Sequence, residues 1–222
     1  MKPKISVIVP AYNEEKLVPR ALKSVPEAPD IELIMIDDGS VDSTGCAMGV
    51  ELAQMQYKEN HRYLRIEKNK GIANAMNRGF ELARGEYIVS LSADDYYVTD
   101  FEQFRPYLDG VNDLVYFDLQ VNDGSIWHVD EKTKHEYVGA VKFIRREFLG
   151  DTRIPDLKYK EDMPFTSALY SKNPKEAFTG IVLKHYNWPH EGSLSWQATQ
   201  DYAQNRELWA KNSGNVLKTE QK

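Results

Sequence analysis

GEYIVSLSADDYY, residues 85–97, is the stretch that decides the fold. Residues 87–91 are rich in β-formers and mostly apolar, which predicts a strand buried inside a sheet. Asp94 and Asp95 follow closely, so their carboxylates should lie at the carboxyl edge of that strand, where open α/β sheets bind ligands. Two neighbouring anions repel each other unless a cation compensates them. The pair therefore predicts a divalent cation that also binds phosphate.

A second acid pair ends an earlier apolar run, in IELIMIDDGS (residues 31–40). Asp37 and Asp38 are followed by Gly39, which permits a tight turn. We expect at most one acid of this turn to cap the next helix, which leaves the others available for a ribose hydroxyl or the imide N–H of a pyrimidine. A solvated acidic turn is the alternative, and the apolar strand before the pair argues against it.

Strand and helix patterns alternate through the first hundred residues. The predicted strands cover residues 4–10, 31–36, 62–66 and 87–91. The predicted helices cover residues 14–24, 42–55 and 71–85. Such βαβ alternation predicts a mostly parallel sheet with helices on both faces.

The pattern after residue 95 is less regular. We expect strands at residues 113–120 and 125–129, joined through the turn residues Asn-Asp-Gly. Helices are expected at residues 99–108 and, as a short basic helix, at residues 142–148. The remaining second half is rich in aromatic residues and prolines and gives no clear periodic pattern.

Composition narrows the class of protein. The chain has 222 residues, 41% of them hydrophobic and 28% charged, which is typical of a globular domain. A net charge of −6 argues against a general polyanion-binding surface but leaves room for a local basic groove. Cys46 is the single cysteine and fits a reducing compartment. No apolar run reaches the roughly 20 residues of a transmembrane helix, so we expect a cytoplasmic protein, with peripheral membrane contact left open.

Two further polar clusters lie at predicted strand ends or helix starts. PAYNEE (residues 10–15) presents an aromatic ring and polar groups where a base or ribose can bind, although taken alone a turn capped by Asn13 is the better explanation. Asn69 and Gly71 precede a helix whose first N–H groups can face a phosphate, and Arg78 lies on that helix. An acid pair about twenty residues later makes this signal more specific.

The order of these motifs resembles that of the inverting glycosyltransferases of family 2. PAYNEE, IDDGSVDST, NKGIANAMNRG and SADD occur at family-like spacing, over residues 4–100 specifically and to about residue 196 more loosely. The resemblance implies an α/β GT-A (nucleotide-diphospho-sugar transferase) fold, with a mostly parallel central sheet flanked by helices. It also implies one domain over residues 1–222. Its parts would be a nucleotide-sugar-binding half to about residue 95, an acceptor-binding half over 96–210 and a polar tail over 211–222.

The same resemblance implies a donor site for a nucleotide-diphosphate sugar, with UDP the expected nucleotide. The implied nucleotide-binding residues are Pro10, Ala11, Tyr12, Glu14, Asp38, Asn69, Gly71, Arg78 and Asp94. The implied cofactor is Mn²⁺ or Mg²⁺, held by Asp95, Asp94 and His190. Many family members carry an aspartate where this chain has Ser92, so we expect Asp95 to carry most of the metal binding, with reduced affinity, and a metal-free mode is the alternative.

The catalytic acids are expected in KYKEDMPF, residues 158–165. Family 2 enzymes take their base from an E-D pair in the second half, which implies Asp162 as general base and Glu161 as an orienting or acceptor contact. Such a base removes the acceptor's proton while that oxygen attacks the anomeric carbon. Without the upstream motifs, a solvated surface pair would be the better interpretation. Tyr186, His190, Ser193 and Ser195 match the family's later tyrosine, basic and serine-rich positions.

The expected function is therefore the inverting transfer of one sugar per encounter by a hexosyl- or related transferase of polysaccharide biosynthesis. A glycan or lipid-linked acceptor is expected, with nucleic acid ranked behind it. A sugar-nucleotide pyrophosphorylase is an alternative, but it normally has a glycine-rich loop after its first strand. A phospho-receiver domain, which also has an acid pair at a strand end, is a non-enzymatic alternative, but such domains are shorter and more regular than this chain. A nucleotide-sugar-binding relative without turnover is the alternative that Ser92 keeps open.

Overall fold

The computed structural model describes residues 2–135, 141–157 and 161–188, together with His190, Glu191, Ser193 and Gln197. Residues up to Asn187 form one compact unit, and the remainder of the chain forms a second. In the second unit, the Ser193 amide donates to the His190 carbonyl at 3.2 Å and the Gln197 amide donates to the Ser193 carbonyl at 2.9 Å.

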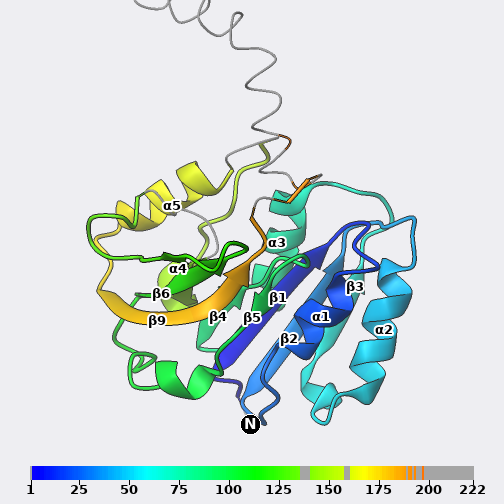
Figure 1. The fold of residues 1–222 in the computed structure, drawn as a ribbon. Coiled ribbons are helices and arrows are strands. Elements are labelled where there is room, and N and C mark those ends of the chain that lie inside the picture. The colour runs from blue at the N-terminus through cyan, green and yellow to red at the C-terminus, as the bar shows by residue number, and fades with distance from the viewer. Residues whose placement is uncertain are drawn as a thin grey trace, which may run out of the picture. The chain divides into compact units, whose positions relative to one another are not determined.

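The first unit is built on one mixed sheet (Figure 1). Its strands are β1 (Ile5–Ala11), β2 (Ile31–Asp37), β3 (Arg62–Arg65), β4 (Tyr87–Ser90), β5 (Tyr96–Tyr97), β6 (Leu114–Val121), β7 (Ile126–Trp127), β8 (Lys142–Arg145) and β9 (Glu176–Tyr186). Its helices are α1 (Val18–Lys23), α2 (Thr44–Gln54), α3 (Ile72–Leu82), α4 (Arg146–Leu149) and α5 (Asp162–Tyr170), with 3₁₀ turns η1 (Lys58–Asn60) and η2 (Phe101–Phe104).

The strands follow the order β3-β2-β1-β4-β8-β6-β9-β5, with β7 paired to β6. The first four are parallel, as predicted, and place their carboxyl ends at one edge of the sheet. β8 enters antiparallel to β4 and β6, and β9 runs parallel to β6 but antiparallel to β5. The parallel pattern therefore holds for the first half of the chain and becomes mixed in the second.

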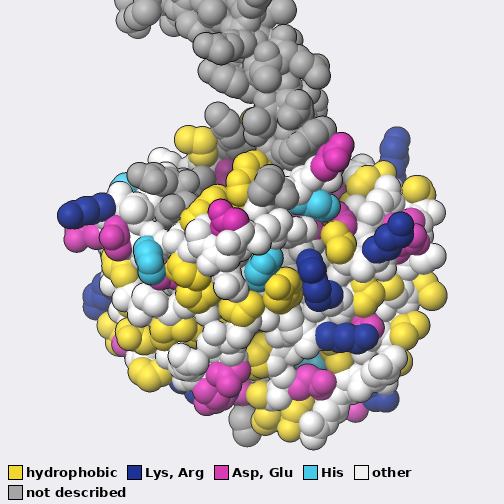
Figure 2. Space-filling model, in the orientation of Figure 1, with side chains coloured by type: hydrophobic (Ala, Val, Ile, Leu, Met, Phe, Trp, Pro, Cys, Tyr) yellow, Lys and Arg dark blue, Asp and Glu magenta, His cyan; other side chains and the backbone are white. Residues whose placement is uncertain are grey.

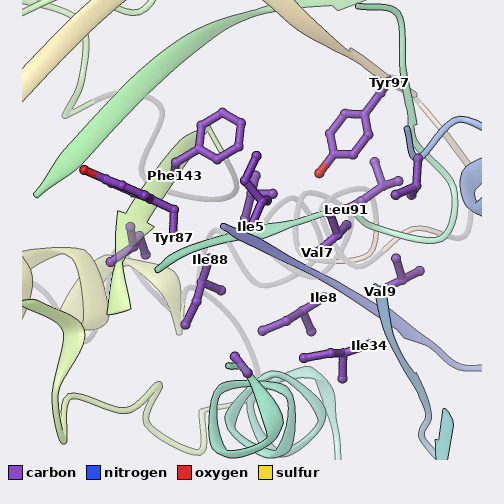
Figure 3. Close-up of a cluster of buried hydrophobic side chains, with 14 of the residues drawn as sticks. Ile5, Val7, Ile8, Val9, Ile34, Tyr87, Ile88, Leu91, Tyr97 and Phe143 are labelled. Atoms are coloured by element: carbon purple, nitrogen blue, oxygen red, sulfur yellow. The ribbon is translucent and has the colours of Figure 1, made fainter. Parts of the chain in front are cut away.

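The parallel half is buried on both faces, which explains its apolar strands. Every residue of β1 and β2 is buried, as expected for strands covered by helices on each side. Figure 3 shows Ile8, Ile34 and Ile88 on the side of the strands that faces a helix. That helix is α3, because a Cβ added at Gly79 would lie 2.4 Å from Ile8 Cγ2. Figure 1 shows α1 and α2 on the opposite face, so the prediction of helices on both faces is confirmed.

Three predicted helices differ from those in the structure. Residues 142–145 form β8 instead of a helix, because pairing with β4 and β6 overrides the local preference of this short basic segment. The helix expected at 99–108 is only the 3₁₀ turn η2, started by Asp100, whose carboxylate accepts the Glu102 amide. The helix expected from residue 14 begins at Val18, with a proline in its first turn.

Sequence reasoning missed β9, as well as β5 and α5. Most residues of β9 are only partly buried, and Lys184 and His185 interrupt its apolar run, so the segment has neither an uninterrupted apolar run nor a regular alternation. Its register with β6 shifts near Gly180, where φ is +64°. The strand nevertheless lies between β6 and β5, and it brings the end of the second half back to the donor half.

The surface carries both signs of charge. On the face shown in Figure 2, basic and acidic side chains are interspersed among the described residues. No helix within the described ranges is long and apolar enough to cross a bilayer.

Two helical glycines provide a matched test of this packing. Gly79→Ala should lower the free energy of unfolding by about 1 to 2 kcal/mol, because overpacking against buried Ile8 outweighs the gain in helix propensity. Gly49→Ala in α2 meets no atom within 4 Å and should raise it by about 0.5 to 1 kcal/mol. Urea unfolding of both variants measures the difference, and equal shifts would contradict the close contact of α3 with β1.

Candidate functional site

Two loops at the carboxyl edge of β1 and β2 are tied together by hydrogen bonds. Ser40 Oγ accepts the Asn13 amide at 3.0 Å, and Thr44 Oγ1 accepts the Glu14 amide at 2.7 Å. In return, Asn13 Oδ1 accepts the Val41 amide at 2.9 Å. Asn13 itself has a left-handed φ of 57°, which asparagine tolerates better than most residues. The two motifs therefore form one preorganised surface.

Tyr12 is the exposed aromatic group of that surface. Its side chain is 42% exposed, so the ring is accessible to a planar ligand. Ala11 and Pro10 end β1 with buried side chains. They can therefore offer a ligand little beyond backbone groups. Glu14 is half-buried beside them.

Asp37 serves the framework of the site. Its carboxylate is wholly buried, with Oδ2 at 2.5 Å from Arg65 Nη1 and at 3.3 Å from the Tyr63 hydroxyl, while Oδ1 accepts the Ser40 amide at 2.8 Å. A Cβ added at Gly45 would lie 2.6 Å from Asp37 Oδ2, so α2 approaches this cluster as closely as a glycine allows.

Asp38 connects the second loop to α3. Its carboxylate accepts the Lys70 amide at 3.0 Å and the Gly71 amide at 2.8 Å. Burial raises the pKa of Asp38 above its usual value, and these two hydrogen bonds partly offset that effect. Asp42, in turn, accepts the Glu15 and Thr44 amides. All three acids of this turn therefore accept hydrogen bonds from the protein, which the sequence did not predict for more than one of them.

The start of α3 is shaped by Asn69 and Gly71. Asn69 Oδ1 accepts the Gly71 amide at 2.9 Å, and Gly71 has a φ of 87° with open space where a side chain would be. The Lys70 and Gly71 amides are bound by Asp38, so they are not available to a phosphate, and the first amides of α3 itself stay a predicted phosphate contact. Arg78 lies farther along α3, about 9 Å from Ile72 by helix rise, and pairs with Glu81. The structure does not bring Arg78 to the sheet edge.

A cavity of about 290 Å³ lies beside this helix start. It is lined by Lys70, Ala73, Asn74, Asn77, Ile154 and Asp156. The Asn77 side chain exchanges two hydrogen bonds with the Ile154 backbone, at 2.8 and 2.9 Å, and so fixes a segment of the second half against α3. A larger hollow of about 350 Å³ involves Glu86 and Arg145 at the opposite edge of the sheet, away from the acid pairs.

Asp94 and Asp95 follow β4 as predicted, and Asp95 is wholly buried. Its Oδ1 accepts the Asn187 amide at 2.9 Å, and its Oδ2 lies 2.9 Å from Lys184 Nζ. Asp94 is half-buried, and its carbonyl accepts Arg20 Nη2 at 2.7 Å. The second half of the chain therefore contributes a cation to the acid pair through β9.

The residues at this edge suit a hard divalent cation. Mn²⁺ and Mg²⁺ prefer oxygen ligands and need only one or two carboxylates when substrate phosphates supply others. Asp95 Oδ2 is buried and receives no hydrogen bond from the described residues, so it offers such a ligand atom. No three His, Cys, Asp or Glu side chains converge on one point within the described ranges. The Lys184 ammonium already neutralises Asp95, so an ion at Oδ2 would have to take its place.

The candidate catalytic acids lie at the start of α5. Asp162 is its first residue and Glu161 precedes it, both half-buried. Burial raises the pKa of Glu161, and the charge of Asp162 adds to this effect. Beneath α5, Lys142 lies 3.5 Å from Thr166 Oγ1, and burial lowers the pKa of Lys142 to about 8 against the opposing charges of Asp162 and Glu176.

α5 is packed directly on α3. The Phe165 ring stacks on Phe80 of α3 with 5.7 Å between centroids. This contact holds the helix that carries Asp162 beside the helix whose start is bound by Asp38. Acids from both halves of the chain are thereby attached to α3.

The later motif residues fall in different parts of the structure. Tyr186 ends β9, in the first unit. His190 and Ser193 belong to the second unit, so the metal role of His190 stays a prediction. Ser195 lies outside the described residues.

Sequence reasoning missed Lys184, Arg65 and Asn77 as partners of the site. Lys184 interrupts the run GIVLKHY, and a lysine inside a strand-like run is a signal of a buried partner. The identity of that partner depends on the pairing of β9 with β5, which the local pattern does not reveal.

Comparisons with known proteins agree with this architecture. The family model described as Glycosyl transferase family 2 matches residues 6–174. A dolichyl-phosphate beta-glucosyltransferase of Dictyostelium discoideum is 34% identical over 135 residues, which are 56% of this chain and 40% of that protein. The chain thus spans less than half the length of this curated relative.

Solved structures share the fold. S. aureus TarS 1-349 in complex with UDP-GlcNAc matches with a TM-score of 0.73 at 22% identity, over 86% of this chain and 60% of that one. Mannosyltransferase PcManGT from Pyrobaculum calidifontis, in complex with GDP-Man and Mn²⁺, matches with a TM-score of 0.67 at 19% identity, over 88% and 60%. The predicted GT-A fold is confirmed.

The interlocked loops provide a test in two adjacent residues. Thr44→Val removes the acceptor of the Glu14 amide at a buried position and should lower the free energy of unfolding by about 1 to 3 kcal/mol. Ser43→Ala removes a side chain that makes no capping hydrogen bond and should change it by less than about 0.5 kcal/mol. Urea unfolding measures both, and a larger loss for Ser43→Ala would contradict this assignment.

Proposed function

The chain belongs to glycosyltransferase family 2, and we propose from this premise that it transfers one sugar from a UDP-linked donor to an acceptor hydroxyl with inversion at the anomeric carbon. The observation that carries the proposal is the attachment of α5 to α3 through Phe165 and Phe80. Through this contact, Asp162 of the second half lies on a helix packed against α3, whose start is bound by Asp38. A transferase of this kind needs both halves around one reaction centre.

The interlocked loops would bind the nucleotide. Tyr12 offers its exposed ring to the base, with Pro10, Ala11 and Glu14 around it. Asp38 retains lone pairs beyond those that bind the α3 amides and can accept a hydrogen bond from base or ribose. Asn69 and Gly71 would line the same pocket. The complexes of TarS with UDP-GlcNAc and of PcManGT with GDP-Man support a nucleotide-sugar donor, and the former favours uridine.

The acid pair would receive the diphosphate. Asp95 and Asp94 are the proposed ligands of Mn²⁺ or Mg²⁺, by analogy with the Mn²⁺ complex of PcManGT. When bound, such an ion neutralises the charge that develops on the leaving nucleoside diphosphate. Asp95 is held in place for this role by the Asn187 amide, and Asp94 by the bond from Arg20 to its carbonyl.

The proposed base is Asp162. Its carboxylate accepts the proton of the acceptor hydroxyl as that oxygen forms a bond to the anomeric carbon, on the face opposite the diphosphate. The bond between that carbon and the diphosphate oxygen breaks, and the electron pair leaves with the nucleoside diphosphate. Glu161 would orient the acceptor. Lys142 is buried beneath the same helix, with Asp162 and Glu176 as its nearby opposing charges.

For the acceptor, we propose a lipid-linked molecule or a glycan. The names of relatives include a dolichyl-phosphate beta-glucosyltransferase and a poly-beta-1,6-N-acetyl-D-glucosamine synthase, which favours a lipid-linked or glycan acceptor over nucleic acid. The alternative function is binding of a nucleotide sugar without turnover. A protein with that function would bind UDP but would release no UDP from UDP-sugars. A panel of UDP-sugars and acceptors, followed by UDP release, separates these two functions.

Stacking on Tyr12 is testable by binding alone. Tyr12→Ala should weaken UDP binding about tenfold, within the range for loss of one base–aromatic contact. Tyr12→Phe retains the ring and should bind as the unmodified protein does. Calorimetric titration with UDP and Mn²⁺ measures both, and unchanged affinity of Tyr12→Ala would place the base elsewhere.

The base assignment is testable by separating turnover from binding. Asp162→Asn should reduce UDP release from the donor at least about a hundredfold, the usual contribution of general base catalysis, while UDP affinity stays the same. Asp151→Asn, an exposed acid in the same half, is the matched control and should retain activity. Turnover that survives in Asp162→Asn would move the role to another acid, with Glu161→Gln the next variant.

A further inference from the structure

The junction of β5 and β9 holds buried polar atoms that lack hydrogen bonds. Within the described residues, three buried side-chain atoms have no hydrogen-bond partner: Asp95 Oδ2, the Tyr97 hydroxyl and His185 Nδ1. All three belong to this one junction, where Tyr96 pairs with His185 and Tyr97 pairs with Lys184. Figure 3 shows the Tyr97 hydroxyl directed into the apolar cluster. Unsatisfied buried groups are rare in native proteins, and an ion that is not present is one explanation for such a group as Asp95 Oδ2.

Lys184 is the charge partner within this junction. Its side chain is 3% exposed, and its ammonium lies 2.9 Å from Asp95 Oδ2 without the direction of a hydrogen bond. The same ammonium lies 5.6 Å from the centroid of the Tyr186 ring. Burial and the charge of Asp95 raise the pKa of the neighbouring Tyr97 well above its usual value, as expected beside a desolvated carboxylate. The ion pair is therefore enclosed but incompletely hydrogen-bonded.

The ion pair between Asp95 and Lys184 is weakly stabilised for a pair that is so completely buried. Removing two charges from water carries a large cost, which ion pairing repays only with good geometry and further hydrogen bonds. Asp95 Oδ1 has that support from Asn187, whereas among the described residues Oδ2 has the ammonium alone. A divalent cation at Oδ2 would exchange one positive partner for a stronger one, so the carboxylate would not become unpaired.

We propose that Lys184 is the resting counter-ion of Asp95 and competes with the divalent cation, so that the cation binds only together with the nucleoside diphosphate that stabilises it. The inference rests on the proposed donor site. In the protein without nucleotide, the cation must displace the buried Lys184 ammonium and gains only one or two carboxylate ligands in return. With nucleotide present, phosphate oxygens complete the ligand set. Binding of the cation and of the nucleotide is then reciprocally coupled.

The experiment measures Mn²⁺ binding to the full chain, by the loss of the electron paramagnetic resonance signal of aqueous Mn²⁺, with and without UDP. For the unmodified protein, UDP should tighten Mn²⁺ binding about tenfold or more. Lys184→Met removes the charge at similar length. Without UDP, this variant should bind Mn²⁺ at least about tenfold more tightly than the unmodified protein, because the repelling ammonium is gone. Its unfolding temperature should fall by about 6 °C or more and recover on addition of Mn²⁺.

Two control variants isolate the charge pair. Lys142→Met removes a second lysine that is buried in the described part of the chain and lies near Thr166, and it should leave Mn²⁺ binding unchanged. Asp95→Asn combined with Lys184→Met removes both charges and should restore the unfolding temperature without any response to Mn²⁺. This double variant also provides the comparison if Lys184→Met alone does not fold.

The possible outcomes separate the two proposals. Equal Mn²⁺ affinity of the unmodified protein and Lys184→Met without UDP overturns the competition, as does tight binding of Mn²⁺ alone to the unmodified protein. If Lys184→Met gains Mn²⁺ affinity but no variant binds UDP, the competition stands and the donor site fails. If UDP binds equally well with and without Mn²⁺ and Lys184→Met gains nothing, the donor site stands and the competition fails.

Discussion

Burial of carboxylates at the edge of a parallel sheet is the constraint on which this structure depends. Asp37, Asp38 and Asp95 each follow an apolar strand and are almost completely enclosed. A buried carboxylate costs several kcal/mol unless a cation or amide groups compensate it. Each therefore has its partner in a segment that comes later in the chain: Arg65 at the end of β3, the Lys70 and Gly71 amides just before α3, and Lys184 of β9 with Asn187 after it. Placing those partners fixes how the later segments lie on the sheet.

These contacts show that several motif residues stabilise the loops of the site. In IDDGSVDST, the hydroxyl and carboxylate groups of residues 40–44 bind backbone amides of residues 13–15. Gly39 and Gly45 leave room for close approach, since a Cβ at Gly39 would lie 2.6 Å from the Asn69 amide nitrogen. Much of the pattern that suggests a ligand thus builds the surface that receives it. What stays directed outward is the ring of Tyr12.

The sequence predicts the donor half well because its signals are local. Apolar runs covered on both faces mark β1, β2 and β4, and helical periodicity with a terminal glycine marks α3. The second half is set by non-local pairing. Lys142 looks like part of a basic helix but lies in a strand between β4 and β6, and β9 has no regular burial pattern. For the same reason the acid pairs are predicted at the correct edge, whereas Lys184 as their partner is not.

The contact between Lys184 of β9 and Asp95 also limits how segments of this domain can be exchanged with those of related proteins. A donor half cut away after Asp95 would expose the apolar edge of β4 and leave the carboxylate without its cation. Exchanging second halves between relatives, an obvious route to new acceptor specificity, would therefore transplant an electrostatic partner of the donor site as well. A graft that omits a positive group opposite Tyr97 would alter the donor end while appearing to change only the acceptor end. The two halves differ in sequence pattern, but the charge of the donor site in the first half depends on a residue of the second half.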